Sequence, residues 1–393
     1  MALTPIKYAR TRNAVIAIKL ETTKGVDAFG GSPSLTDDFM RVGGITPGNP
    51  QDTQDPGELT GSLDAADDRC GGVRGTLQLT AVMRGSGTPG QAPRWGRLAQ
   101  ICTMKQTTIV PVAAQALTAA GTVRQGVLGS NYPATAQALR GQFAQLTGNP
   151  AAGALAQVED YTAGKLARFG YTFPTALGTD TNVALPAQVL YSPTSVEEEF
   201  QSATIYYYLD GWLRKYTGMV GTFSITCNTG QAATMQFNLQ GQIASFERAA
   251  IPSPIQFEST TAPLFKNGIS RLDGTLAKVG AFTFDMGATL ENPPNPEALE
   301  GYDPAIVTAR QGSGNINPLY QEGLTVETFA KFRAGTQMSY AAALGKDPGN
   351  RMGFLCPALL ATDFGDTAIG NVTASGLPFR TTGQDQSLFI SVA

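Results

Sequence analysis

Large hydrophobic residues alternate with polar residues in several stretches of this chain. Three stretches share one pattern, in which a Gly-Thr or Gly-Ala step follows a valine and apolar side chains then recur at every second position: residues 73–79, 220–225 and 279–284. Because successive side chains of a strand point to opposite faces, each stretch predicts a strand with one buried face. A repeated strand unit is typical of a structural building block rather than of a catalyst.

The same alternation predicts further strands, at 14–20, 75–83, 167–173, 276–286, 325–332 and 388–392. The clearest pair lies at 204–209 and 212–216, because Asp210-Gly211 between them is the signal for a two-residue hairpin turn. A second hairpin follows over residues 223–239, where the alternation resumes on both sides of an Asn-Thr-Gly turn. The centre of the chain is therefore predicted to be a run of antiparallel strands.

Helical spacing is rarer than strand alternation. Short helices are expected at 94–102 and 340–344. A further helix is expected after Pro133, because apolar residues there recur at helical spacing and proline suits a first turn. Those apolar residues are Ala136, Leu139, Phe143 and Leu146.

Changes in composition predict the domain organisation. Residues 113–189 are rich in Ala and Gln and interrupt the strand-rich pattern, so we interpret them as an inserted subdomain. After Pro252 and Pro254 the same kinds of strand return, which indicates an internal duplication. The prediction is an N-terminal arm (1–13), a first domain (14–112 with 190–250), the insertion (113–189) and a second domain (251–393), each domain being of ordinary size.

Two long polar segments, 44–69 and 290–323, are expected to be loops. The first is acidic, and polar segments of this length inside a domain are either solvated or functional. One interpretation is a solvated loop; the other is an arm that becomes ordered against a neighbouring subunit. Its carboxylates are Asp52, Asp55, Glu58, Asp64, Asp67 and Asp68.

Residues 71–158 contain no Asp or Glu but carry seven basic residues. We predict that these cations face the acidic segment across a subunit interface, since opposite charges favour association in a fixed register. A phosphate-facing patch and scattered surface arginines remain alternatives. The expected contact residues, besides the six carboxylates, are Arg74, Arg84 and Trp212. The full basic set is Arg74, Arg84, Arg94, Arg97, Lys105, Arg124 and Arg140.

The overall composition fits a mainly β protein with long surface loops. The chain has 393 residues, of which 45 are Gly and 24 Pro, and only 15% are charged. A net charge of −3 gives no general attraction to nucleic acid or to an anionic membrane. The apolar run at 14–18 is too short for a signal peptide, and no run approaches the ~20 residues of a membrane span. We therefore expect a protein made and kept in a cytoplasm, with no membrane partner.

No catalytic or metal-binding constellation is found in the sequence. The absence of histidine excludes Ser-His-Asp and Cys-His catalysis and histidine-based zinc sites. Four widely spaced cysteines are expected to be isolated, buried thiols. They are Cys70, Cys102, Cys227 and Cys356.

Two further motifs are weighed and set aside. The sequence Gly-Ser-Gly-Thr-Pro-Gly at 85–90 matches a dinucleotide fingerprint, but Pro89 and Pro93 break the helix it needs, so a hairpin loop is expected. The acidic run 197–199, with Glu159 and Asp160, is expected to mark solvated edges rather than paired catalytic carboxylates. The sequence thus predicts no enzyme and no cofactor.

Three segments of the chain resemble the tail tube, or major tail, proteins of long-tailed bacteriophages (siphophages). They are ETTKGVD at 21–27, GSGTPGQAPRWG at 85–96, and the hairpin, Gly-Thr strand and return strand of 203–241. The resemblance extends over 14–112 and 190–250, and more loosely over 255–393. The insertion at 113–189 does not share it.

The resemblance implies a fold and an assembly. The expected fold class is mainly β, with two tail-tube-like β-sandwich or barrel domains, short flanking helices and the inserted subdomain. Such proteins form rings, and the rings stack into a tube through which viral DNA is ejected into the host. A duplicated chain would form a homotrimer with pseudo-sixfold symmetry, which we favour over a homohexamer.

The resemblance also implies partners and location. The tube would contact terminator, tape measure and distal tail proteins, and viral DNA would pass through without specific binding. The protein would reside in the virion tail, and in the host cytoplasm during assembly. Alternatives are another virion β-ring protein (tail terminator, baseplate or head decoration) and a glycan-binding β-sandwich adhesin.

Overall fold

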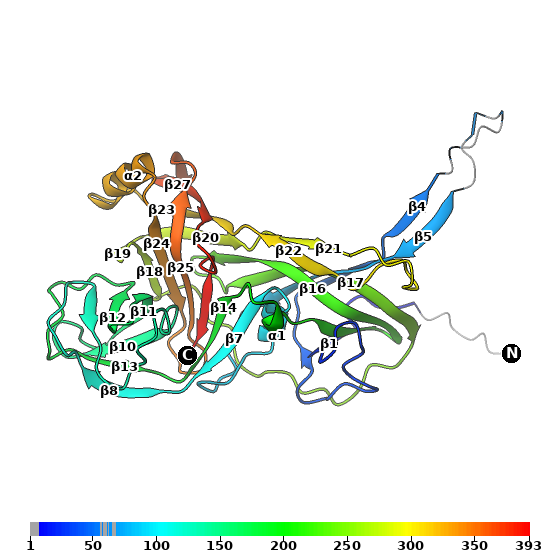
Figure 1. Cartoon of the computed structure of the whole chain (residues 1–393), viewed down its shortest axis with the longest axis horizontal. Coiled ribbons are helices and arrows are strands. Elements are labelled where there is room, and N and C mark those ends of the chain that lie inside the picture. The colour runs from blue at the N-terminus through cyan, green and yellow to red at the C-terminus, as the bar shows by residue number, and fades with distance from the viewer. Residues whose placement is uncertain (1–7, 56, 58–60, 62, 65–67) are drawn as a thin grey trace.

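The computed structural model describes residues 8–55, 57, 61, 63–64 and 68–393. The predicted mainly β fold class is confirmed: nearly all regular structure is strand, and two short α-helices accompany it, α1 (Gly96–Gln100) and α2 (Leu324–Ala334). Figure 1 shows an elongated molecule, with a small sheet at one end and a projecting hairpin at the other. Among the described residues, no helix has the length and apolar character needed to span a membrane.

The first half of the chain builds one part of a large antiparallel sheet. Its strands are β1 (Ala14–Leu20), β2 (Phe39–Met40), β3 (Gly44–Gly48), β6 (Gly75–Val82), β7 (Met104–Ile109), β14 (Gln188–Pro193), β15 (Ala203–Leu209), β16 (Trp212–Asn228) and β17 (Thr234–Arg248). Consecutive pairing gives the spatial order β1–β15–β16–β17–β6–β3. The predicted hairpin turn is confirmed, because Asp210 (φ 43°) and Gly211 (φ 96°) both have the left-handed backbone of a two-residue turn.

The second half supplies the rest of the large sheet. Its strands are β18 (Ile269–Leu272), β19 (Thr275–Leu276), β20 (Val279–Asp285), β23 (Ser313–Pro318), β24 (Met338–Leu344), β25 (Met352–Ala361), β26 (Gly365–Ile369), β27 (Val372–Thr381) and β28 (Phe389–Val392). The spatial order is β18–β24–β25–β27–β23–β20. Strand β26 follows β25 in the chain and pairs with the same edge of β27, farther along that strand.

The two halves therefore repeat one pairing order. Each also has a helix at the same point of the chain: α1 follows β6, and α2 follows the corresponding strand β23. Strand β16 corresponds to β25 and β26 together, β6 to β23, and β3 to β20. The halves are joined directly where the end of β16 pairs with β20, from Ser224 opposite Asp285 to Asn228 opposite Ala281. This repetition is what a duplication would produce; the domain boundaries given above remain a prediction.

One hydrophobic core lies under both halves of the large sheet. Alternate residues of the strands point into it, for example Leu77 and Leu79 of β6, each 1% exposed. The ring of Phe223 lies 6.1 Å from that of Phe237 in the same half and 6.4 Å from that of Phe284 in the other. The junction between the halves is thus packed as well as hydrogen-bonded.

The segment between β7 and β14 forms a separate six-stranded sheet with its own core. Its strands are β8 (Val112–Ala116), β9 (Gln125–Val127), β10 (Phe143–Thr147), β11 (Ala154–Tyr161), β12 (Leu166–Phe169) and β13 (Asn182–Leu185), in the order β8–β13–β10–β11–β12–β9. The strands that lead into and out of this segment pair with each other, and Ile109 lies opposite Gln188. The segment thus leaves and re-enters the large sheet at adjacent points.

Three sequence predictions of secondary structure are wrong. The helix after Pro133 is absent, because Gln137 (φ 63°) and Gly141 (φ 81°) turn the chain and Phe143 begins β10. The strand expected at 325–332 is α2, which ends at Gly335 in the left-handed conformation typical of a helix C-terminus. The helix expected at 340–344 is β24, whose residues are all buried, so no alternation marks it as a strand.

Smaller differences concern loops and cysteines. Residues 85–90 lead from β6 into α1 and do not form a hairpin loop. The polar segment 290–323 contains β22 (Ile306–Arg310) and β23, and β22 forms a hairpin with β21 (Ala288–Glu291). The strand expected at 167–173 ends at Phe169, and that at 276–286 is divided into β19 and β20. All four cysteines are free, but Cys70 is exposed while the other three are buried.

Candidate assembly surfaces

Part of the acidic segment forms a projecting hairpin. Strands β4 (Gln51–Gln54) and β5 (Arg69–Val73) pair with each other and extend away from the body of the molecule (Figure 1). Asp55, Asp64 and Asp68 lie beyond the paired residues and are exposed, as is Leu63. We call the residues between β4 and β5 the arm tip. Two predicted contact residues, Glu58 and Asp67, lie outside the described residues.

The base of the hairpin is fixed to the second half of the chain. The Arg74 guanidinium forms a 2.5 Å ion pair with Asp52, and the Tyr302 hydroxyl donates to the same carboxylate at 2.8 Å. The backbone N–H of Val73 donates to Glu300 at 2.7 Å. The hydrogen bond to Asp52 is the main cause of the raised pKa of Tyr302. Asp52 and Arg74, predicted as contacts between subunits, are thus joined within one chain.

The other basic residues of 71–158 also have partners within the chain. Arg84 donates to the carbonyl of Thr260 at 3.3 Å, and burial lowers its pKa. Arg94 donates to three backbone carbonyls. Carboxylates pair with the remaining cations, as Arg97–Asp38, Lys105–Glu199, Arg124–Glu159 and Arg140–Asp160. All seven basic residues of 71–158 thus have partners within the chain.

Trp212 lies in an exposed ladder of aromatic rings and guanidinium groups on β16 and β17. Its ring stacks on Phe246, with centroids 5.3 Å apart and planes at 24°. Arg248 lies over the Trp212 ring at 5.2 Å, and Arg214 lies over the Phe246 ring at 5.0 Å. Trp212 is 38% and Phe246 56% exposed. We call these four residues the arginine–aromatic ladder.

Among the described residues, several strands of the large sheet pair with a single neighbour, and β2, β7 and β19 are three of them. Two others are β3 and β26. Within the described residues, β3 pairs in register with β6 alone, and β26 with β27 alone. They lie at opposite ends of one continuous run of strands, β3–β6–β17–β16–β20–β23–β27–β26. Unpaired edges of this kind are templates for pairing with another chain.

The face of this run that points away from the core carries mostly hydroxyl and amide side chains. Cross-strand register places Thr46, Gln78, Asn238 and Thr222 in one row, and Thr226, Thr283 and Asn315 in another. In the rows that contain Thr222 to Asn228 of β16, the charged members of this face are Asp285 and Arg380. The face is therefore polar but close to neutral.

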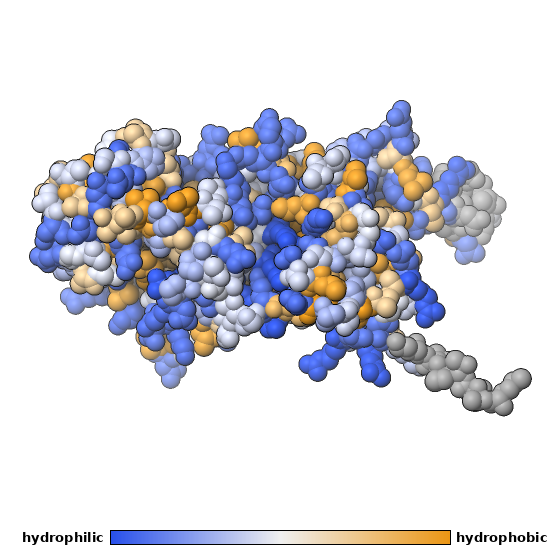
Figure 2. All heavy atoms as spheres, turned by 90° about the horizontal axis from the view of Figure 1, so that it is seen from below, coloured by the Kyte–Doolittle hydropathy of each residue, from blue (hydrophilic) through white to orange (hydrophobic). Residues whose placement is uncertain are grey.

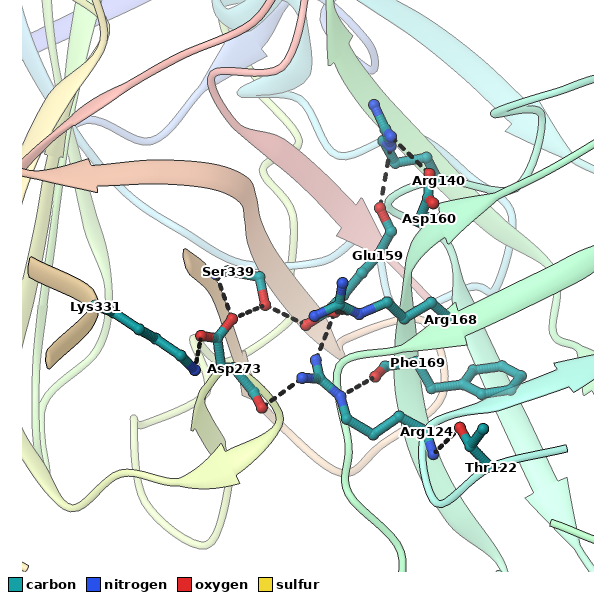
Figure 3. A network of polar contacts seen from close by, with 10 residues as sticks. All are labelled: Thr122, Arg124, Arg140, Glu159, Asp160, Arg168, Phe169, Asp273, Lys331 and Ser339. Atoms are coloured by element: carbon teal, nitrogen blue, oxygen red, sulfur yellow. Dashed lines mark hydrogen bonds and ion pairs between the residues drawn. The ribbon is translucent and has the colours of Figure 1, made fainter. Parts of the chain in front are cut away.

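A buried ionic network fixes the six-stranded sheet to the second half (Figure 3). Glu159 of β11, 3% exposed, accepts from Arg124 at 2.6 Å and from the Ser339 hydroxyl at 2.6 Å. Asp273 accepts from Lys331 of α2 at 2.7 Å and from the Ser339 N–H at 2.9 Å. Burial raises the pKa of Glu159, against the opposing effect of Arg124. Glu159 thus helps to hold the six-stranded sheet against the second half of the chain. The prediction that Glu159 lies at a solvated edge is wrong.

The lower face of the molecule shows small apolar patches among hydrophilic side chains, with no single extended apolar area (Figure 2). Within the described residues, no cluster of three or more Cys, Asp or Glu side chains is arranged to hold a metal ion. The features that stand out are the unpaired edges, the hairpin and the ladder. All are suited to contacts between proteins rather than to chemistry on a small substrate.

Comparison with known families decides the interpretation. The family model of phage tail tube proteins matches residues 11–379. The chain belongs to the phage tail tube protein family. No protein among curated sequences matches it. Membership makes this chain a structural component of the virion tail that assembles with itself into a tube.

Several residues of these tail tube surfaces were not found from the sequence. Phe246, Arg214 and Arg248 accompany Trp212, and Glu300 and Tyr302 hold the hairpin base. Their partners lie on other strands or in the other half of the chain. Only the alternation of β16 and β17 gave a usable signal, because it places Trp212 and Phe246 on paired strands.

Proposed function

We propose that three copies of this chain close into a ring through the unpaired edges of β3 and β26. Rings then stack into the tail tube of a siphophage, the conduit for DNA ejection. The observation that carries this proposal is the repeated pairing order of the two halves. The domains predicted from the sequence, 14–112 with 190–250 and 251–393, would be the two ring units of each chain.

The junction between the halves serves as the template for the junction between chains. Strand β16 pairs through its last five residues with β20. In the repeat, β26 corresponds to the end of β16, and β3 corresponds to β20. Pairing β26 of one copy with β3 of the next therefore reproduces between chains the contact already made within each chain. Three chains then give six similar junctions, and closure of the ring pairs the open edges of β3 and β26.

The hydroxyl and amide face of the sheet would line the bore of the tube. Duplex DNA carries one negative charge per ~1.7 Å, so a wall of arginine and lysine would hold it by releasing counterions. Asp285 and Arg380 lie in one row of paired residues and offset each other in charge. Such a neutral wall lets DNA slide without specific binding.

Stacking of rings would use the projecting hairpin. Its base is held by Asp52, Arg74 and Tyr302, which fixes the direction in which β4 and β5 project. At the two ends of the tube the same surfaces would meet other tail proteins, such as terminator, tape measure and distal tail proteins.

Electron microscopy and native mass measurement of the purified chain test the proposal. We expect tubes, and rings of about three times the 41.2 kDa chain mass at low concentration. Rings of six chains would contradict the trimer, and discrete rings that never stack would indicate another virion ring protein. A chain that stays monomeric at high concentration would contradict ring closure altogether.

Shortening the hairpin separates stacking from ring closure. Replacing residues 55–68 by a short Gly-Ser turn leaves β3, β4 and β5 in place. We expect soluble rings that do not polymerise. Tubes of normal length from this variant would show that the arm tip has no role in stacking.

A further inference from the structure

We propose that the arginine–aromatic ladder (Trp212, Phe246, Arg214 and Arg248) of one copy of this chain receives the exposed face of helix α2 of the neighbouring copy. The inference rests on the proposed ring and adds a second contact to the junction between β26 and β3. The occupant, a second copy of the chain, is identified by complementary side chains and by the repeat of the two halves.

The ladder offers apolar rings and guanidinium groups side by side. The stacked rings of Trp212 and Phe246 are both exposed, and an arginine lies over each ring. Within the described residues, neither Arg214 nor Arg248 forms an ion pair with a carboxylate. Exposed aromatic and arginine side chains are enriched at the centres of protein interfaces. The ladder is therefore suited to a partner that presents apolar side chains next to carboxylates.

Helix α2 carries the matching groups on one exposed face. Val326 is 74% and Phe329 42% exposed, and residues three positions apart lie on the same side of a helix. Exposed carboxylates flank this pair, Glu322 just before the helix and Glu327 in its first turn. The apolar pair can cover the aromatic rings of the ladder while the carboxylates approach its two guanidinium groups.

The repeat of the two halves brings α2 to the ladder of the next copy. The last part of β17 pairs with the start of β16 as β28 pairs with the start of β25, so β28 and the last part of β17 are equivalent. Within one chain, α1 of the first half approaches β28 of the second half through β14. The Trp95 ring, directly before α1, lies 5.2 Å from that of Tyr191, which is paired opposite Ile390. In the ring, α2 would approach in the same way the last part of β17 in the next copy, which carries Phe246 and Arg248.

Helix α2 also lies beside the edge strand that would close the ring. The rings of Phe329 and Phe332 lie 5.3 and 6.3 Å from that of Phe364, the residue directly before β26. Strand β6 covers the edge of β17 only as far as Gly241, which lies opposite Gly75, so within the described residues the last part of β17 pairs with β16 alone. In Figure 1, α2 and β17 lie apart in one chain. The contact is therefore one between copies.

Photo-crosslinking of assembled full-length chain identifies the occupant. We place p-benzoylphenylalanine at Phe246 in ¹⁵N-labelled chain and mix it with unlabelled wild type. Mass spectrometry is expected to show a mixed-isotope adduct with the peptide that contains Val326 and Phe329. Tubes in which the probe reacts only with other segments, or not at all, would overturn this inference and leave the proposed function standing.

The matched control places the same probe at Phe200, which is 36% exposed and precedes β15. Because Leu209 at the end of β15 lies opposite Trp212, Phe200 is at the far end of that strand from the ladder. This probe should give no adduct with the α2 peptide. An equal yield of that adduct from both probes would contradict the assignment of the ladder.

Charge exchange tests the electrostatic part. The double variant R214E/R248E should raise the protein concentration needed for ring formation about tenfold, because attraction becomes repulsion at two sites. The reciprocal variant E322R/E327R should weaken rings similarly, and the two changes together should restore assembly toward wild type, all with an unchanged circular dichroism spectrum. A merely structural role would make the combined variant worse than either alone. That result, or normal assembly by R214E/R248E, would contradict the inference, whereas wild-type chain that forms no rings would contradict the proposed function.

Discussion

Single residues fix the relative positions of segments that are far apart in this sequence. Gly72 of β5 is the clearest case, because a Cβ placed there would lie 1.8 Å from the backbone oxygen of Glu300. Glycine at this position is required by close approach of two backbones, not by an unusual φ. The hairpin base can contact the second half of the chain only because this residue has no side chain.

Gly72→Ala should release the hairpin base. The added methyl group meets backbone that cannot move aside cheaply, so we expect a cost of about 1–3 kcal/mol and faster proteolysis within the arm. Thermal unfolding and limited trypsin digestion measure the two effects. The matched control is Gly44→Ala, where no atom lies within 4 Å of the new Cβ. Equal behaviour of the two variants would contradict this account of Gly72.

Glu159 has a comparable role in the six-stranded sheet. Glu159→Ala should leave Arg124, whose side chain is 16% exposed, without its carboxylate. Removing one partner of a buried ion pair costs about 3–5 kcal/mol. Chemical denaturation would measure the loss. A change below 1 kcal/mol, within the range of exposed ion pairs, would show that the network does not hold the sheet in place.

The pH dependence of stability offers a second test of Glu159. Its pKa in the folded chain is raised by burial above the ordinary value of 4.5, so the folded state favours the protonated form. The contribution of this group to stability is therefore greatest at low pH and declines as pH rises through the raised pKa. Relative to Glu159→Gln, wild type should gain in melting temperature as pH falls from about 7 toward 4.5. The opposite trend would mean that the carboxylate is the favoured form.

At the scale of elements, the unpaired edges of the large sheet determine where another chain can add a strand. Strand β26 ends in a two-residue turn, with Ile369 opposite Val372. In such a hairpin the next pair inward does not exchange backbone hydrogen bonds, so the N–H of Ala368 points away from β27. That N–H is available to a strand added at the edge.

Ala368→Pro should therefore block ring closure without unfolding the chain. Proline removes the outward N–H but no hydrogen bond to β27. We expect a normal circular dichroism spectrum and melting temperature, with rings and tubes absent by electron microscopy. Ala368→Val keeps the N–H and should assemble normally. Tubes from the proline variant would exclude β26 as a ring contact.

The scale of elements also shows what could be read from the sequence. Strands β16 and β17 were predicted correctly because their buried and exposed residues alternate, which is a local signal. Strand β15 is buried on both faces, and the Asp210-Gly211 turn that follows it marked it. Strand β24 was missed because it is buried on both faces and rich in alanine. Its environment is set by strands β18 and β25, which no local pattern reveals.

Contacts between residues far apart in the chain could not be predicted from the sequence for the same reason. Glu159, Ser339 and Asp273 come from three separate segments and meet only in the folded chain. The acidic character of 44–69 was evident, but the prediction of a loop was wrong for β3, β4 and the start of β5. These strands form by pairing with β6 or with each other, which no local pattern reveals. The excess of cations in 71–158 was also evident, yet most of these side chains are bound within the chain.

For the whole molecule, the neutral face that we propose to line the bore is the property most directly linked to the proposed passage of DNA. Gln236 and Asn238 of β17 are exposed on this face. Replacing both by lysine places six new positive charges in each ring of three, and duplex DNA should then bind with an affinity that falls steeply with salt.

Tubes assembled in the presence of a short fluorescent duplex would show the difference. The Q236K/N238K tubes should retain DNA on sedimentation at about 50 mM salt and release it near 200 mM, whereas wild-type tubes should retain little at either. A neutral pair, Q236S/N238T, is the control. Strong retention by wild type, or none by the lysine variant, would place this face outside the bore.

The adjacent positions of Ile109 and Gln188 have a consequence for how such proteins diversify. Because the polypeptide departs and returns at neighbouring points of one strand pair, the excursion between them can be gained, lost or exchanged without altering the order of strands around it. In the proposed ring of three chains, a foreign domain grafted there would be displayed in three copies per ring along the tail. Its successful presentation would depend on whether the hydroxyl of Ser339, left behind on the scaffold, finds a new acceptor in place of Glu159.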